Sequence, residues 1–175
     1  MNNQTENSGV STKKLALTAI FAAVAVVGST FSFPVLGSKC APVQHRVNVL
    51  CAVFLGPGWG LAAALIASVI RNLTGLGTLL AFPGSMCGAL LSGLLYKQFK
   101  VLPAAWIGEV FGTAVIGGML AYPIASAIMG NANAALFTFV VPFLISTVGG
   151  TIIAAVITLA LQSRGVIGRL REEIE

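Results

Sequence analysis

Long apolar runs, separated by short polar or glycine- and proline-rich breaks, dominate the sequence. The dipeptide Phe33-Pro34 ends the first run, and the segment Gly56-Pro57-Gly58 divides the next one into two halves. The runs predict six helices, over residues 13–33, 42–55, 59–72, 84–97, 104–129 and 135–162. Residues 1–12 are polar and predict a disordered N-terminus. The length of the chain predicts a single domain over residues 13–175.

The second and third predicted helices are unusually short for helices this apolar. Each has about 14 residues and is about 21 Å long, whereas the hydrocarbon core of a bilayer is about 30 Å thick. Unpaired backbone at membrane depth is tolerated only where it is buried in protein or lines a cavity. We therefore expect the loops 35–41 and 73–83 to enter one side of the membrane and enclose a pocket.

Polar side chains gather at the two ends of these short helices, in the stretch 37–72. Polar groups inside a membrane are costly, so they indicate a functional site. The alternative is that they only satisfy loop carbonyls and one another. Tyr122 and Phe139 add candidate apolar walls because of their expected depth. The candidate substrate-binding residues are Lys39, Gln44, His45, Asn48, Arg71, Asn72, Tyr122 and Phe139.

Composition places the chain in a membrane. Of its 175 residues 57% are hydrophobic and 9% are charged, and the mean hydropathy is +0.94. Soluble domains contain about 25% charged residues. The sequence therefore predicts an all-α integral membrane protein.

The net charge of +5 is explained by topology and not by nucleic-acid binding, because the basic residues flank apolar segments and do not alternate with aromatic residues. Six spans with both termini in the cytoplasm agree with the positive-inside rule. A single span over 42–72 would instead place Lys97, Lys100 and the C-terminal arginines outside. The inner face then collects Lys13, Lys14, Lys97, Lys100, Arg164, Arg169 and Arg171.

Glu109 is the only acidic residue between Glu6 and Glu172. We expect it near the inner face, where Lys97 or Lys100 would pair with it. An intramembrane enzyme would need His45 and Glu109 as an acid–base pair, and the expected depths place these two near opposite faces. A channel would need polar residues through the full depth, which the sequence does not provide.

The three cysteines, Cys40, Cys51 and Cys87, do not form a pattern typical of a disulfide framework or a metal site, and we expect no cofactor. The sequence also lacks a Gly-x-x-x-x-Gly-Lys-Ser/Thr loop. Any ATP hydrolysis linked to this chain would therefore take place on another chain.

Three alanines of the first predicted helix, Ala16, Ala19 and Ala23, are spaced three and four residues apart and form one flat stripe. Small side chains let helices approach closely, and this closeness drives helix association in lipid. The stripe is either a contact for a partner protein or an internal packing face.

Several segments resemble the substrate-binding S components of energy-coupling factor transporters. They are the alanine stripe, the helix entry Ala41-Pro42-Val43-Gln44-His45 and the turn Leu55-Gly56-Pro57-Gly58-Trp59-Gly60. More narrowly, GSKCAPVQHRVNV, RNLTGLGTLLAFPGSM, GEVFGT and AYPIA resemble the ThiW group. The likeness extends from Lys13 to about Ile157.

The resemblance implies a six-helix bundle that binds a vitamin precursor in a pocket open to the outside. It implies association with a membrane coupling subunit and two ATP-hydrolysing subunits, and the stripe Ala19 to Ala23 would contact the coupling subunit. The expected substrate is the thiazole precursor of thiamine, hydroxyethylthiazole. The basic residues would also suit a phosphorylated precursor or another small vitamin.

Overall fold

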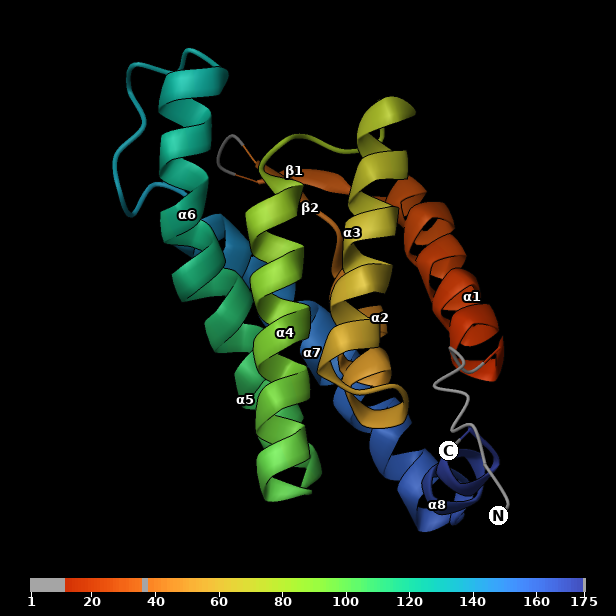
Figure 1. Cartoon of the computed structure of the whole chain (residues 1–175). Coiled ribbons are helices and arrows are strands. Elements are labelled where there is room, and N and C mark those ends of the chain that lie inside the picture. The colour runs from red at the N-terminus through yellow and green to blue at the C-terminus, as the bar shows by residue number, and fades with distance from the viewer. Residues whose placement is uncertain (1–11, 36–37, 175) are drawn as a thin grey trace, which may run out of the picture.

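Helices that run side by side make up most of the structure, which is a computed structural model describing residues 12–35 and 38–174 (Figure 1). The predicted disordered segment lies outside these residues, except for Thr12, which begins the first helix. The helices are α1 Thr12–Gly28, α2 Pro42–Phe54, α3 Pro57–Leu73, α4 Ala81–Phe99, α5 Leu102–Phe111, α6 Gly118–Pro123, α7 Val140–Ser163 and α8 Val166–Ile174. A 3₁₀ turn, η1 (Ser29–Phe31), extends α1, and two π-helical segments, η2 (Gly112–Gly117) and η3 (Ile124–Ile128), make residues 102–128 one continuous rod.

Three of these helical segments are long and apolar enough to cross a membrane. They are Thr12–Phe31, Leu102–Ile128 and Val140–Ser163, and large apolar side chains such as Val27 and Val156 are exposed on them. Exposed apolar surface of this kind suits contact with lipid. The chain is therefore a multi-pass membrane protein.

The predicted helix count is wrong by one, because the described chain forms seven helical rods. The segment after residue 162, for which the sequence predicts only a short tail, contains α8. Gly165 has a φ of 67°, which lets the chain turn sharply after α7. Ile167 and Ile174 of α8 are then buried against the bundle.

A short β-hairpin replaces the predicted loop 35–41. Strand β1 (Phe33–Val35) pairs antiparallel with β2 (Ser38–Cys40), so that Pro34 lies opposite Lys39. Pro34 is tolerated because a two-stranded sheet consists of edge strands. Figure 1 shows the hairpin beside the same end of the bundle as the start of α4.

Two proline positions explain why α3 and α4 begin earlier than predicted. Pro57 occupies the first turn of α3 and Pro83 the first turn of α4, so these helices begin earlier than predicted. The first four N–H groups of a helix have no partner within it, and proline loses nothing there. The connecting segment between α3 and α4 shortens accordingly to residues 74–80.

Helix α2 is the centre of the bundle. Nine of its 13 residues are buried, and it packs against α1, α3, α4 and α7. Val47, Val49, Cys51 and Val53 belong to the main apolar core. Its polar residues Gln44 and Asn48 are therefore held inside the protein and not at its surface.

The rod 102–128 packs backbone to backbone against α4. A methyl group added to Gly112 would lie 2.6 Å from the carbonyl oxygen of Cys87, and one added to Gly117 would lie 2.6 Å from the Cα of Gly84. These two glycines are five residues apart, and the π-helical geometry of η2 closes i to i+5 contacts. The π segment thus keeps both glycines on the face that meets α4.

Gly112→Ala should destabilise the bundle, because no space exists for the added methyl group. Overpacking of this kind costs about 1–3 kcal/mol, and we expect a lower unfolding temperature in detergent. Gly149→Ala on α7 is the matched control, since nothing lies within 4 Å of its added methyl group. Alanine favours a helix by about 1 kcal/mol over glycine, so the control should unfold at the same or a higher temperature. Equal behaviour of the two variants would contradict the close contact.

Candidate functional site

A cavity of about 40 Å³ opens between β2, the start of α2, the end of α3, the start of α4, the rod and α7. It is smaller than typical ligand pockets of about 300–1,000 Å³, so a bound molecule would have to separate some of the lining groups. Apolar walls come from Leu80, Ala81 and Phe143, and polar atoms converge from the opposite side. Its lining residues are Lys39, Ala41, Gln44, His45, Arg71, Leu80, Ala81, Gly84, Ser85, Thr113, Phe143 and Ser146.

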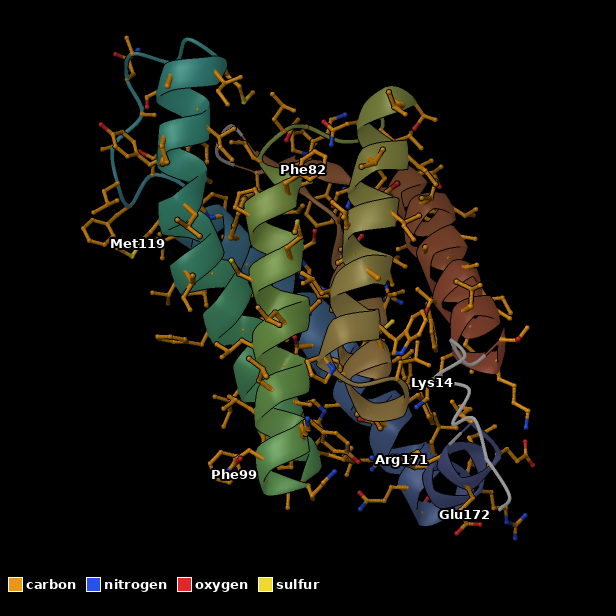
Figure 2. The ribbon with its side chains drawn as sticks, viewed as in Figure 1. Lys14, Phe82, Phe99, Met119, Arg171 and Glu172 are labelled. Carbon is orange, nitrogen blue, oxygen red and sulfur yellow. The ribbon has the colours of Figure 1, made fainter. Side chains whose placement is uncertain are left out.

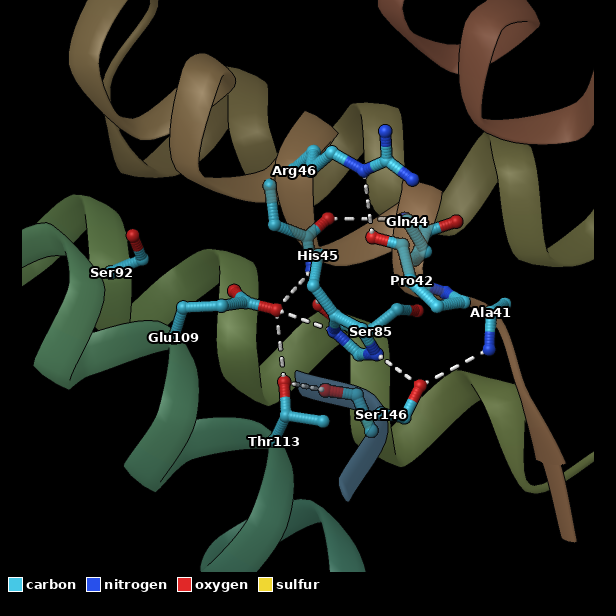
Figure 3. A network of polar contacts seen from close by, with 12 residues as sticks. Ala41, Pro42, Gln44, His45, Arg46, Ser85, Ser92, Glu109, Thr113 and Ser146 are labelled. Carbon is cyan, nitrogen blue, oxygen red and sulfur yellow. Dashed lines mark hydrogen bonds and ion pairs between the residues drawn. The ribbon is translucent and has the colours of Figure 1, made fainter. Parts of the chain in front are cut away.

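His45 and Glu109 contact each other at the base of this cavity, with 2.8 Å between Nδ1 and Oε1 (Figure 3). Glu109 is fully buried and His45 is 6% exposed. The prediction that these residues lie near opposite faces is wrong. The expected pairing of Glu109 with Lys97 or Lys100 is wrong as well, because His45 is its ion-pair partner.

The lengths of α2 and α5 explain why the predicted depths of His45 and Glu109 were wrong. His45 lies nine residues, about 14 Å, before the end of α2, and Glu109 lies seven residues, about 10 Å, after the start of α5. Both helix ends lie at the same end of the bundle (Figure 1). The two side chains therefore meet at mid-depth, whereas the sequence alone predicts that the short α2 begins at the membrane surface.

Two further donors hold the Glu109 carboxylate. Its Oε1 lies 3.0 Å from Nδ2 of Asn48 and 3.1 Å from Oγ1 of Thr113. A side chain on Gly88 would collide with this group, since a methyl group there would lie 2.7 Å from Oε2 of Glu109. Charges buried in protein are tolerated where they are paired and hydrogen-bonded, and this arrangement meets that condition at Oε1.

Ser146 of α7 links His45 to the hairpin. Its Oγ lies 3.0 Å from Nε2 of His45 and accepts a hydrogen bond of 3.1 Å from the backbone N–H of Ala41 (Figure 3). When neutral His45 carries its proton on Nδ1, the N–H group donates a hydrogen bond to Glu109, and the Ser146 hydroxyl donates one to Nε2. Every donor then has an acceptor, from the carboxylate to the end of β2.

Two side-chain amides connect the carboxylate to a buried guanidinium. Nη1 of Arg71 donates to Oε1 of Gln44 over 3.2 Å, and Nε2 of Gln44 donates to Oδ1 of Asn48 over 3.0 Å. Asn48 in turn donates to Glu109. Arg71 is 3% exposed. The two amides thus connect the guanidinium of Arg71 to the carboxylate of Glu109 through a chain of hydrogen bonds. Nε of Arg71 is left without a partner among the described residues.

The remaining predicted residues divide into those near the cavity and those with local roles. Lys39 lines the cavity, and its ammonium group donates to the carbonyl of Gly75. Asn72 binds the carbonyls of Ser68 and Thr78 and so fixes the segment after α3. That contact is structural, and Asn72 is not among the residues that line the cavity.

The two predicted aromatic walls lie farther out. Phe139 is buried and packs on Phe143, with 6.3 Å between ring centroids, so it supports a lining residue without lining the cavity itself. Tyr122 is half-buried in α6 and is not among the lining residues.

Sequence reasoning missed the contributions of α4, the rod and α7. Ser85, Thr113 and Ser146 are hydroxyl residues within apolar runs, and Phe143 is one phenylalanine among ten. Hydroxyl side chains in helices commonly bond the preceding turn, so they gave no distinct signal. Their shared feature is that they line the same cavity, and this can be recognised only once the fold is known.

The alanine stripe lies on the outer surface of α1. Ala16, Ala19 and Ala23 are exposed, whereas Ala22 and Ala25 of the same helix are buried in the core. The stripe is thus not an internal packing face of this chain.

A double-mutant cycle can measure the His45–Glu109 contact. His45→Ala and Glu109→Gln should each destabilise the protein, because each leaves a buried partner with one contact fewer. The pair should show a coupling of about 1–3 kcal/mol in unfolding free energy. His45→Ala combined with Glu172→Gln, at an exposed position on α8, should be additive. Additivity in both cycles would show that the contact contributes nothing.

A comparison with protein-family models completes the description of the chain. Neither the search of curated proteins nor the search of solved structures found a match. The model of one family, described as thiamine-precursor transporter protein (ThiW), matches residues 15–164. These residues include nearly all of α1 to α7 and every residue that lines the cavity. The chain therefore belongs to the ThiW family of thiamine-precursor transporter proteins.

Proposed function

We propose that the chain is the substrate-binding membrane subunit, or S component, of an energy-coupling factor importer for hydroxyethylthiazole, the thiazole precursor of thiamine. The observation that carries this proposal is the cavity, which combines an apolar wall with a fixed set of polar groups. Membership of a transporter family supports it. The energy-coupling mechanism and the thiazole substrate rest on the resemblance of the motifs.

The chemistry of the residues that line the cavity suits a small heteroaromatic alcohol. Phe143 and Leu80 offer apolar surface to a ring, while His45, Ser146 and Arg71 offer hydrogen bonds to a hydroxyl group or a ring nitrogen. The free Nε of Arg71 is a donor for which the described residues provide no acceptor. A ligand acceptor would satisfy it.

A phosphorylated precursor is the second candidate. Lys39 and Arg71 both line the cavity, and guanidinium groups bind phosphate through parallel hydrogen bonds. Glu109 already has hydrogen-bond contacts with His45, Asn48 and Thr113. Lys39 and Arg71 are therefore the charged groups that remain to contact a ligand. Binding measurements with both forms separate these candidates.

The contact between His45 and Glu109 also raises the possibility of an enzymatic role. Ser146, His45 and Glu109 follow the contact order of hydrolase triads, in which a nucleophile needs backbone N–H groups to stabilise an oxyanion. Ser146 is the seventh residue of α7, where backbone N–H groups bond the preceding turn. Its oxygen also accepts from Ala41. We therefore propose that these groups bind substrate and do not react with it.

The exposed alanine stripe is the proposed contact for the coupling subunit. An apolar groove lies beside it between α1 and α2, and both Ala23 and Arg46 line this groove. A partner helix could approach α1 closely there. ATP hydrolysis would then take place on two further subunits.

The proposed topology places both termini in the cytoplasm. The end of the bundle that carries α8 and the end of α4 holds most of the basic residues, whereas Lys39 and Arg71 lie toward the other end. The positive-inside rule assigns the more basic end to the cytoplasm. The cavity then opens toward the outside.

Arg71→Met should weaken ligand binding, because it keeps most of the apolar stem and removes the donors. Losing a buried hydrogen bond costs about 1–3 kcal/mol, which raises the Kd about five- to 150-fold. Titration of purified protein with hydroxyethylthiazole and its phosphate would measure this, with Arg46→Met as a control outside the cavity. The ligand should be recovered chemically unchanged. Parent-like binding by Arg71→Met would exclude the cavity as the binding site.

Ala19→Trp and Ala23→Trp should abolish uptake and co-purification of the coupling subunit while leaving ligand binding unchanged. The indole would hold a partner helix away from α1. Val156→Trp, at a position of α7 that is 65% exposed, controls for the added bulk. Normal uptake by both alanine variants would remove the stripe from the mechanism.

Topology can be tested by labelling single cysteines in a cysteine-free background. Thr74→Cys lies after α3 and Gln98→Cys near the end of α4, and both positions are exposed. An impermeant thiol reagent added to intact cells should label position 74 and not position 98. The opposite pattern would reverse the proposed orientation.

A further inference from the structure

A second cavity, of about 260 Å³, lies at the other end of the bundle. It is formed by the start of α1, the turn between α2 and α3, the end of α4 and α8. Figure 2 shows two of its basic residues, Lys14 and Arg171, close together at this end of the molecule. Its lining includes four cationic side chains, those of Lys14, Lys97, Lys100 and Arg171.

The positive charge of the three lysines exceeds what the surrounding groups neutralise. Within residues 12–35 and 38–174, no carboxylate lies within ion-pair distance of Lys14, Lys97 or Lys100. The carboxyl ends of α2 and α4 each carry about half a negative charge, and the amino end of α3 carries about half a positive charge. Against three ammonium groups, these helix ends offset only about half a charge.

The turn before α3 lines the same cavity and brings the positive end of that helix to it. Gly56 and Pro57 line it, and Gly56 caps α3 without any side-chain hydrogen bond. Gly56 has a φ of 84°, a conformation that side chains disfavour. The N–H of Gly56 donates to the carbonyl of Cys51 and Pro57 has no N–H, so this turn contributes the positive end of the α3 dipole and not a free donor.

Lys100 occupies a backbone position that ordinarily favours glycine. It ends α4 with a φ of 57°, and it is the only non-glycine residue with positive φ in the described chain. Glycine is the usual residue at such helix ends. Strained residues of this kind cluster at functional sites, and here the strain keeps an ammonium group at the rim of the cavity.

The walls beside the cations are apolar. Phe54, Leu55 and Tyr96 line the cavity, and the guanidinium of Arg171 lies 5.7 Å from the centre of the Tyr96 ring. A ligand with a charged head next to apolar atoms could therefore place both in this cavity.

We propose that this cavity binds the phosphate group of an anionic phospholipid. Basic pockets between membrane helices suit lipid headgroups, and cations beside the apolar side chains of Phe54, Leu55 and Tyr96 match the phosphate of a phospholipid and the apolar part next to it. An acidic segment of a partner protein would match only the cations. This site is separate from the substrate cavity, so the proposal stands or falls independently of the import function.

Native mass spectrometry of the full chain released from nanodiscs tests the proposal. The discs contain either phosphatidylcholine alone or a mixture with phosphatidylglycerol. The test variant is the double substitution Lys97→Gln with Lys100→Gly, in which glycine also relieves the backbone at position 100. Each basic residue near an anionic headgroup contributes about a factor of five, so the variant should hold phosphatidylglycerol about 30-fold more weakly. Its unfolding temperature should not fall.

Arg169→Gln is the matched control, because it removes a charge from exposed α8 surface outside the cavity. It should retain phosphatidylglycerol as the parent does. An equal loss in this control, or no loss in the double variant, would overturn the proposal. Binding of inorganic phosphate without phosphatidylglycerol would assign the site to a soluble anion and refute the lipid. Loss of coupling-subunit association with unchanged lipid binding would assign it to a protein partner.

Discussion

The buried carboxylate of Glu109 is the constraint on which the centre of this molecule depends. A carboxylate without partners in a membrane protein is so unfavourable that the surrounding elements must supply donors. His45 and Asn48 come from α2 and Thr113 from the rod, while Gly88 of α4 leaves the space. The carboxylate therefore fixes the rotation of α2 about its axis and its depth relative to α5. A single charge specifies how three helices meet.

Close backbone packing makes this arrangement geometrically feasible. The rod approaches α4 without side chains between them at Gly112 and Gly117, which brings Glu109 and Thr113 within reach of α2. A regular α-helix would rotate one of the two glycines away from α4, and the π-helical segment η2 corrects this rotation. Backbone irregularity and the polar network are thus two parts of one solution.

The sequence predicted the helices well because apolar runs and proline positions are local signals. Six of the seven helical rods follow from them, and so do the shortness of α2 and the clustering of Gln44 and Asn48. Four of the predicted polar residues, Lys39, Gln44, His45 and Arg71, also line the cavity between β2 and α7. It could not reveal that α2 begins at mid-depth, because that depends on the hairpin and on tertiary contacts. For the same reason the partners of Glu109 and the role of Ser146 became visible only in three dimensions.

The hydrogen bond from Ala41 to Ser146 has a consequence for molecular discrimination. In the structure the hairpin end, Ser146 and His45 satisfy one another's hydrogen bonds. A molecule that enters by separating them must return equivalent hydrogen bonds, since buried groups left unpaired are costly. An apolar analogue of the right shape lacks those groups and would be rejected, even if it filled the space well. Under the proposed function, the protein's own hydrogen bonds therefore compete with every ligand for the same groups.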